Sequence, residues 1–106
     1  MEDVDEEPYR IDRMLTQIVA SGVLSKAAGL IWGECQDCRP RDFQPSNSSP
    51  YTLGEVVRDI FSSLTMPIIS GFTIGHTDDQ TTLPIGPQVN LDANARTLTY
   101  LEGATI

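Results

Sequence analysis

The first candidate for chemistry is His76, the only histidine among the 106 residues. It directly follows Gly75, and Gly71 lies four residues before that glycine. Histidine can act as a general base near neutral pH when a further group, usually a carboxylate, holds its ring through the other nitrogen. Glycine allows a second segment of the chain to approach closely. The pattern favours a histidine held on a bend, but spacing alone does not choose its carboxylate partner.

The second candidate is the pair Cys35 and Cys38, which are separated by two residues in a Cys-x-x-Cys pattern. This pattern is typical of a redox pair or of half a zinc site. A closed zinc site needs four ligands, and the chain offers only His76 beyond these two cysteines. We expect two reduced thiols, as in a cytosolic protein. Metal binding by Cys35, Cys38 and His76 remains a weaker alternative.

Composition and charge narrow the class of protein. The chain is 40% hydrophobic and 21% charged, as in an ordinary globular domain, and its net charge is −8. A negative field repels phosphate backbones, so we expect no nucleic-acid partner. No apolar run approaches the roughly 20 residues that cross a bilayer, and no export signal is visible. We therefore expect no membrane contact and a cytoplasmic location.

Two helices are strongly indicated. One begins near Pro8, which suits a first helical turn, and ends near Gly22. The other begins at Thr52, which forms a capping box with Glu55. Apolar residues recur at helical spacing in both and predict one buried face each: Ile11, Met14, Leu15, Ile18 and Val19 in the first, and Leu53, Val56, Val57, Ile60, Phe61 and Leu64 in the second.

The remaining segments favour strands, which makes the chain a mixed α/β domain. Residues 28–32 and 66–70 are short apolar runs typical of buried strands, and residues 81–85 are expected to be extended. Residues 88–91 and 97–101 alternate in polarity and predict a hairpin, with Val89 and Leu91 facing Leu98 and Tyr100. A long loop is predicted over residues 33–50. Because Met1 opens the chain with no strand before it, we expect this to be one part of a longer protein.

Residues 29–33 read G-L-I-W-G, residues 71–76 read G-F-T-I-G-H, and residues 82–86 read T-L-P-I-G. These and further motifs, in order along the whole chain, resemble those of the LD-carboxypeptidase family of serine peptidases. Each motif is weak alone, and together they are specific. Residues 2–15 resemble the family's L-E-D…Y-x-I-D-R-x-L segment, residues 29–33 its G-I-I-x-G strand, and Asp37-Cys38 its F-x-D-C. Residues 66–76 resemble I-P-V…G-L-P-x-G-H, residues 82–86 resemble T-L-P-x-G, and residues 91–99 resemble the closing hairpin.

The resemblance implies a fold and a site. It covers only the C-terminal domain of the family, a small swivelling β/β/α-type domain with a barrel-like mixed sheet and two main helices. The family uses a Ser–Glu–His triad whose serine belongs to an N-terminal nucleophile domain that this chain lacks. The catalytic glutamate falls on Glu2 and the catalytic histidine on His76. Since Glu2 lies at a free, acidic terminus, we expect it to be partly disordered.

The implied function is that of a muramoyltetrapeptide carboxypeptidase, which releases a terminal D-amino acid from murein peptides during cell-wall recycling. The implied partners are a murein tetrapeptide-like substrate, the N-terminal domain and a second copy in a homodimer, with no cofactor. The chain has no G-x-S-x-G or comparable nucleophile turn, so we predict that it hydrolyses nothing alone. Two alternatives stay open: a microcin C immunity-type hydrolase, and a non-catalytic binding or dimerisation module that retains the fold.

Overall fold

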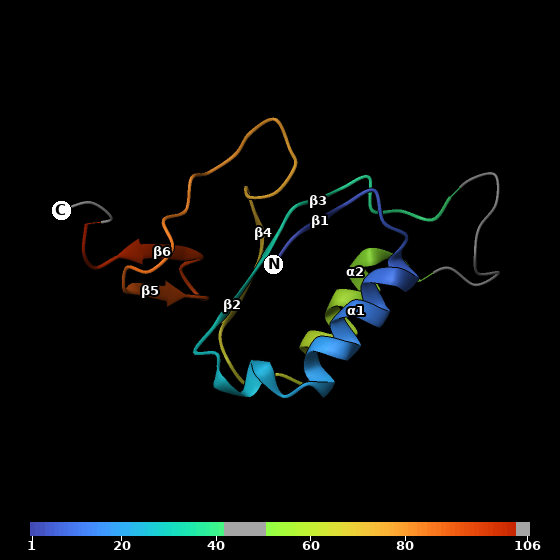
Figure 1. Cartoon of the computed structure of the whole chain (residues 1–106), viewed down its shortest axis with the longest axis horizontal. Coiled ribbons are helices and arrows are strands. Elements are labelled where there is room, and N and C mark those ends of the chain that lie inside the picture. Colours follow the sequence, from blue (N-terminus) through green and yellow to red (C-terminus); the bar gives the residue numbers. More distant parts are fainter. Residues whose placement is uncertain (42–50, 104–106) are drawn as a thin grey trace.

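The computed structural model describes residues 1–41 and 51–103. Within these residues the chain is a mixed α/β domain with two main helices, which confirms the predicted class (Figure 1). The helices are α1 (Pro8–Ala20), α2 (Leu53–Phe61) and the short 3₁₀ helix η1 (Val23–Lys26). The strands are β1 (Asp3–Val4), β2 (Leu30–Gly33), β3 (Cys35–Gln36), β4 (Ile68–Phe72), β5 (Val89–Asp92) and β6 (Thr97–Tyr100).

The strands pair two by two. β1 runs parallel to β3, β2 runs parallel to β4, and β5 and β6 form an antiparallel hairpin. β3 follows β2 after a single residue, Glu34, so the two behave as one bent strand. The N-terminal segment lies along one edge of this strand and β4 along the other (Figure 1). Over the described residues the strands close no barrel.

The first helix begins at Pro8, as predicted. Ile11 and Leu15 are almost completely buried, at 1% and 2% exposure, and anchor α1 on the sheet. Met14 is 38% exposed, so its prediction as a core residue is wrong. Met14 is one position away from Leu15, which turns it about 100° around the helix and out of the buried stripe. The helix ends at Ala20, Ser21 is its C-cap residue, and Gly22 then takes a left-handed conformation with φ of 74°.

The second helix carries the predicted capping box. The Thr52 backbone N–H donates to Glu55 Oε2 at 2.8 Å, and the Glu55 backbone N–H donates to Thr52 Oγ1 at 3.3 Å. These bonds satisfy groups that the first turn of a helix leaves without partners. Val56 and Phe61 are buried, as the helical pattern predicts.

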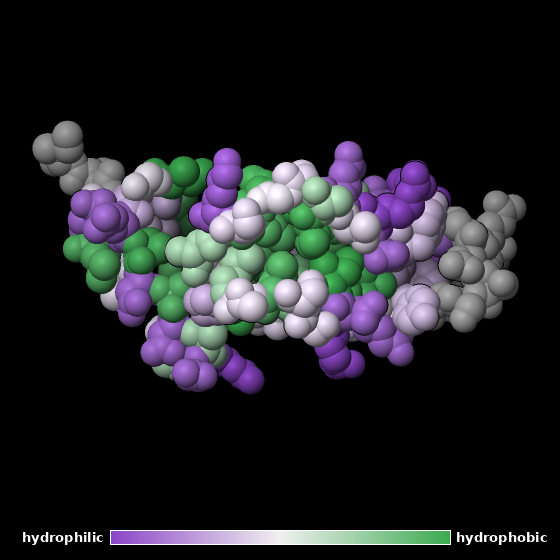
Figure 2. All heavy atoms as spheres, turned by 90° about the horizontal axis from the view of Figure 1, so that it is seen from below, coloured by the Kyte–Doolittle hydropathy of each residue, from purple (hydrophilic) through white to green (hydrophobic). Residues whose placement is uncertain are grey.

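The core lies between the two helices and one face of β2. Leu30 and Trp32 are buried against the helices, and the Trp32 and Phe61 rings meet edge to face with centroids 5.9 Å apart. Because side chains alternate along a strand, Ile31 and Gly33 face the opposite side of β2. Apolar surface also remains in the middle of the face that Figure 2 shows, with hydrophilic side chains toward both ends. On that side Ile31 is half-buried, and Gly33 is buried beneath Ile74 and Glu2.

The C-terminal hairpin has the predicted register. Val89 faces Tyr100 and Leu91 faces Leu98. The Asp92 side chain accepts hydrogen bonds of 2.9 Å from two backbone N–H groups in the turn. Leu91 also packs so closely on Gly29 that a Cβ there would lie 2.6 Å from its Cδ2. The hairpin is thereby fixed beside the start of β2.

Two expectations about the connections are wrong. Residues 81–85 form no strand, and Tyr100 instead bonds through its hydroxyl to the Pro84 carbonyl at 3.1 Å. The expected loop over residues 33–50 contains β3, and its residues 42–50 lie outside the part of the chain that the structure describes. None of the helices in the described ranges has the length and apolar character required to span a membrane.

Candidate active site

The structure brings together the two residues that the resemblance selects. His76 Nδ1 lies 2.9 Å from Glu2 Oε2, although 74 positions separate the residues in the sequence. The side chains are 56% and 31% exposed, respectively. Among residues 1–41 and 51–103, Glu2 is the only hydrogen-bond partner of His76. The pair is thus formed and remains open to the surface.

Glu2 is placed by backbone bonds on both sides of it. The Met1 amino group donates to the Ile31 carbonyl at 2.8 Å, and the Gly33 N–H donates to the Met1 carbonyl at 2.7 Å. Further on, β1 pairs with β3, with Asp3 opposite Cys35. The expectation that Glu2 is partly disordered is therefore wrong, because these bonds fix the segment that carries it.

His76 is placed by the end of β4. The Glu34 N–H donates to the Phe72 carbonyl at 3.1 Å, and the Ile74 N–H folds back onto the same carbonyl at 2.7 Å. A loop follows and is closed by Thr81, whose N–H donates to the Thr73 carbonyl at 2.7 Å. The hydroxyls of the two threonines lie 2.8 Å apart. These bonds direct His76 back over the sheet toward Glu2.

The geometry fixes the roles of the two ring nitrogens. An ionised carboxylate can only accept hydrogen bonds, so Nδ1 of a neutral His76 carries the proton that it donates to Glu2. Nε2 then has a lone pair and can take a proton. With Nδ1 protonated and Nε2 able to accept a proton, the pair has the form of a held general base. Beside the pair, partial burial lowers the pKa of the Met1 amino group, and the Glu2 charge opposes this shift.

Two glycines make the approach possible, and only one was noted from the sequence. Gly75 adjoins the Glu2 carboxylate, as its position beside His76 suggested. A Cβ at Gly71 would meet open space, so only its backbone φ of +74° favours glycine there. Gly33 was missed, although it lies beneath Ile74 and Glu2. Its place at the end of the short strand β2 was the available signal.

Cys35 and Cys38 form a disulfide, so the expectation of two reduced thiols is wrong. Asp37 takes a left-handed conformation with φ of 54°, which turns the chain sharply and leaves the two Cα atoms 5.6 Å apart. The bond removes both thiolates that the metal alternative with His76 requires. No cluster of three potential metal ligands occurs among the described residues.

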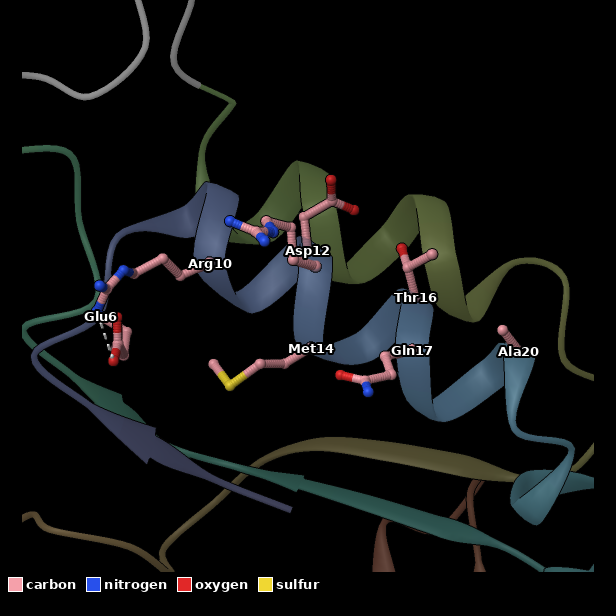
Figure 3. Close-up of a pocket in the computed structure, with 8 residues that line it drawn as sticks. Glu6, Arg10, Asp12, Met14, Thr16, Gln17 and Ala20 are labelled. Atoms are coloured by element: carbon pink, nitrogen blue, oxygen red, sulfur yellow. Dashed lines mark hydrogen bonds and ion pairs between the residues drawn. The ribbon is translucent and has the colours of Figure 1, made fainter.

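Two pockets flank α1. An apolar pocket of about 190 Å³ lies between the N-terminal segment and the helix, and its lining includes Glu2, Met14 and Trp32. A wider, open pocket follows the outer face of α1 from Glu6 to Ala20 (Figure 3). Arg10 and Glu6 form an ion pair of 3.1 Å at one end of it. Neither lining includes His76, whereas Glu2 contributes to the apolar pocket.

The chain is similar to several named proteins. The chain is 40% identical to a Synechocystis protein named as a carboxypeptidase, over 95% of this chain and 32% of the relative. It is 35% identical to a Bacillus subtilis protein named as a murein peptide carboxypeptidase, over 99% of this chain and 32% of the relative. It is 26% identical to the microcin C7 self-immunity protein of Escherichia coli, over 96% of this chain and 28% of the relative.

The fold has a solved counterpart as well. A muramoyltetrapeptide carboxypeptidase from Oxalobacter formigenes matches with a TM-score of 0.73 and 34% identity, over 92% of this chain and 33% of that one. The chain thus spans about a third of the length of these relatives. Its residues 1–91 match the family described as the LD-carboxypeptidase C-terminal domain. On these matches, the chain belongs to the LD-carboxypeptidase family.

Proposed function

We propose that the chain is the C-terminal domain of a serine LD-carboxypeptidase, which releases a terminal D-amino acid from murein peptides in cytoplasmic cell-wall recycling. The observation that carries the proposal is the 2.9 Å contact between His76 Nδ1 and Glu2 Oε2. It leaves Nε2 available for a hydroxyl from outside the described residues. The names of the Bacillus subtilis and Oxalobacter formigenes relatives support the substrate class.

In this mechanism His76 Nε2 removes the proton of a serine hydroxyl as its oxygen attacks the scissile carbonyl. The serine comes from the N-terminal domain of the same protein. Glu2 keeps Nδ1 protonated and stabilises the imidazolium that forms. The imidazolium then returns its proton to the leaving amine of the D-amino acid. Water repeats the sequence to release the acyl group from the serine and regenerate the base.

The test uses the intact enzyme, with both domains, and a murein tetrapeptide substrate. We expect His76→Ala to lower kcat by about 10⁴-fold or more, because the serine would lose its general base. Asp78→Asn is the matched control: Asp78 is exposed on the same loop two residues away. D-amino acid release is measured by chromatography. Undiminished release by His76→Ala would refute the role of the histidine and favour a binding or dimerisation module.

The microcin C immunity-type hydrolase is the second candidate, supported by the 26% identity to the Escherichia coli self-immunity protein. It would use the same pair on a different acyl group. The intact enzyme should therefore be offered an aminoacyl-adenylate analogue beside the tetrapeptide. A higher kcat/KM for the analogue would select this candidate, and a higher value for the tetrapeptide would select the murein carboxypeptidase.

A further inference from the structure

The space around the Glu2–His76 pair depends on a missing side chain. A Cβ atom at Gly75 would lie 2.8 Å from Glu2 Oε2, the oxygen that bonds His76. It would also lie 2.9 Å from the backbone carbonyl oxygen of Glu34. Carbon atoms of folded side chains do not approach oxygen atoms this closely, so either the carboxylate or the loop would have to move.

A second glycine supports the same loop from below. A Cβ at Gly33 would lie 2.5 Å from Ile74 Cγ1, 2.6 Å from the Ile74 carbonyl oxygen and 3.1 Å from Glu2 Cβ. Gly33 and Gly75 therefore hold the segment that leads to His76 between the sheet and the carboxylate. The backbone on both sides is tied to the Phe72 carbonyl, through the N–H groups of Glu34 and Ile74. The neighbours of an added side chain have little freedom to retreat.

Gly75 combines two features that favour glycine, a left-handed backbone conformation and a close contact with the candidate site. Its φ of +129° favours glycine, but Gly86 has a φ of +112°, and a Cβ there would meet nothing within 4 Å. Gly71, at +74°, also has open space. Among the glycines with positive φ in the described residues, only Gly75 faces a side chain of the candidate site.

We propose that Gly75, supported by Gly33, is a positioning residue: its bare backbone lets the Glu2 carboxylate lie directly against the loop and so sets the direction in which His76 presents Nε2. This inference rests on the proposed function, because the direction of Nε2 matters only if His76 acts as a base. A displacement of about 1 Å in a reacting group can lower a rate by roughly 10²-fold.

The first experiment reads the hydrogen bond directly in the 106-residue chain. With a single histidine, long-range ¹H–¹⁵N spectra contain one unambiguous imidazole. We expect a neutral ring protonated on Nδ1 in the unaltered chain and a mixture of the two tautomers in Gly75→Ala. Gly86→Ala is the matched control, since it has a similar φ without the contact, and it should keep the Nδ1 form. Gly33→Ala should resemble Gly75→Ala, since it crowds the same loop without requiring positive φ.

The second experiment measures catalysis in the intact enzyme. We expect Gly75→Ala to lower kcat by about 10²-fold with KM nearly unchanged, because the base is misdirected while substrate contacts remain. In a Glu2→Ala background the same substitution should lower kcat by less than threefold, since the carboxylate it displaces is already absent. An equal loss in both backgrounds would show that Gly75 acts independently of Glu2 and would overturn the proposal.

Three other outcomes would also overturn it. In the first, Gly75→Ala keeps both the Nδ1 form and full kcat. In the second, Gly86→Ala reproduces the effects of Gly75→Ala. In the third, circular dichroism shows that Gly75→Ala unfolds the whole chain, which would make Gly75 a requirement of the fold. The proposed function fails by a different result, full activity of His76→Ala, so the two failures are distinguishable.

Discussion

At the scale of the residue, the Glu2–His76 contact has a well-defined geometry but adds little to stability. Both side chains are partly exposed, and water and salt screen such a pair, so it contributes about 0–1 kcal/mol. Among the described residues, the side-chain hydrogen bond of Glu2 is the one to His76. Under the proposed function, a carboxylate that stabilises little but is held in place by the strand beside it serves the site and not the fold.

The small contribution of Glu2 to stability and its proposed role in the site together give a prediction for Glu2→Gln in the intact enzyme. The substitution keeps the size of the side chain and removes its charge, so Nδ1 is no longer held in the protonated form. We expect kcat to fall by about 10⁴-fold, as for loss of the carboxylate from a triad, while the free energy of unfolding changes by less than about 1 kcal/mol. Steady-state kinetics and urea unfolding measure the two quantities. A large loss of stability with normal kcat would assign Glu2 to the fold instead.

The sequence was informative about individual residues only where chemistry or a motif marked them. His76 was conspicuous as the single histidine, and the resemblance selected Glu2. The disulfide was not predictable, because Cys-x-x-Cys suits thiols, metals and disulfides alike, and the left-handed turn at Asp37 is visible only in the structure. Gly33 was missed for a similar reason: its importance comes from Ile74, which lies far along the chain.

At the scale of the element, local signals were reliable and long-range pairing was not. The helix after Thr52 was predictable because its cap lies within four residues, and the hairpin because its strands are adjacent. The strands β1 and β3 have two residues each and exist only because distant segments pair. The segment predicted as extended over residues 81–85 forms no strand, since its bonds to Thr73 and Tyr100 are single contacts and no strand pairs along it.

The cap of α2 makes a prediction about pH. Hydrogen bonds from the Thr52 backbone N–H and then its hydroxyl lower the pKa of Glu55 below its usual value of 4.5. A lowered pKa in the folded state means that the stabilisation is complete above pH 4.5 and is lost as the pH falls through the folded value. We expect the unaltered chain to be more stable than Glu55→Gln above pH 4.5, with the difference vanishing in stronger acid.

Urea unfolding between pH 7 and pH 3 measures this difference. Asp59→Asn is the control, because Asp59 lies on the same helix without a part in the cap. It should show no comparable change with pH. If Glu55→Gln and the unaltered chain lost stability in parallel on acidification, the charged form of Glu55 would not be what the cap stabilises.

At the scale of the whole molecule, the described chain encloses only a small core. The buried apolar residues are Ile11, Leu15, Leu30, Trp32, Val56, Phe61 and Ile69, and apolar surface stays open on the face in Figure 2. The chain spans about a third of its relatives. The proposed base lies on this third, and no described residue offers His76 a hydroxyl. Under the proposed function, catalysis therefore requires two parts of one protein to meet at Nε2.

The final prediction follows from this division. The 106-residue chain alone should release no D-amino acid from a murein tetrapeptide, and neither should the N-terminal domain expressed separately. Mixing the two should restore release, with a rate that rises with concentration and then saturates as the domains associate. A His76→Ala chain mixed in the same way should restore nothing, because it would occupy the same surface without supplying a base. Release by the unmixed chain would contradict the proposal by placing the nucleophile on this chain. Release by the mixture with His76→Ala would contradict it by placing the base on another residue.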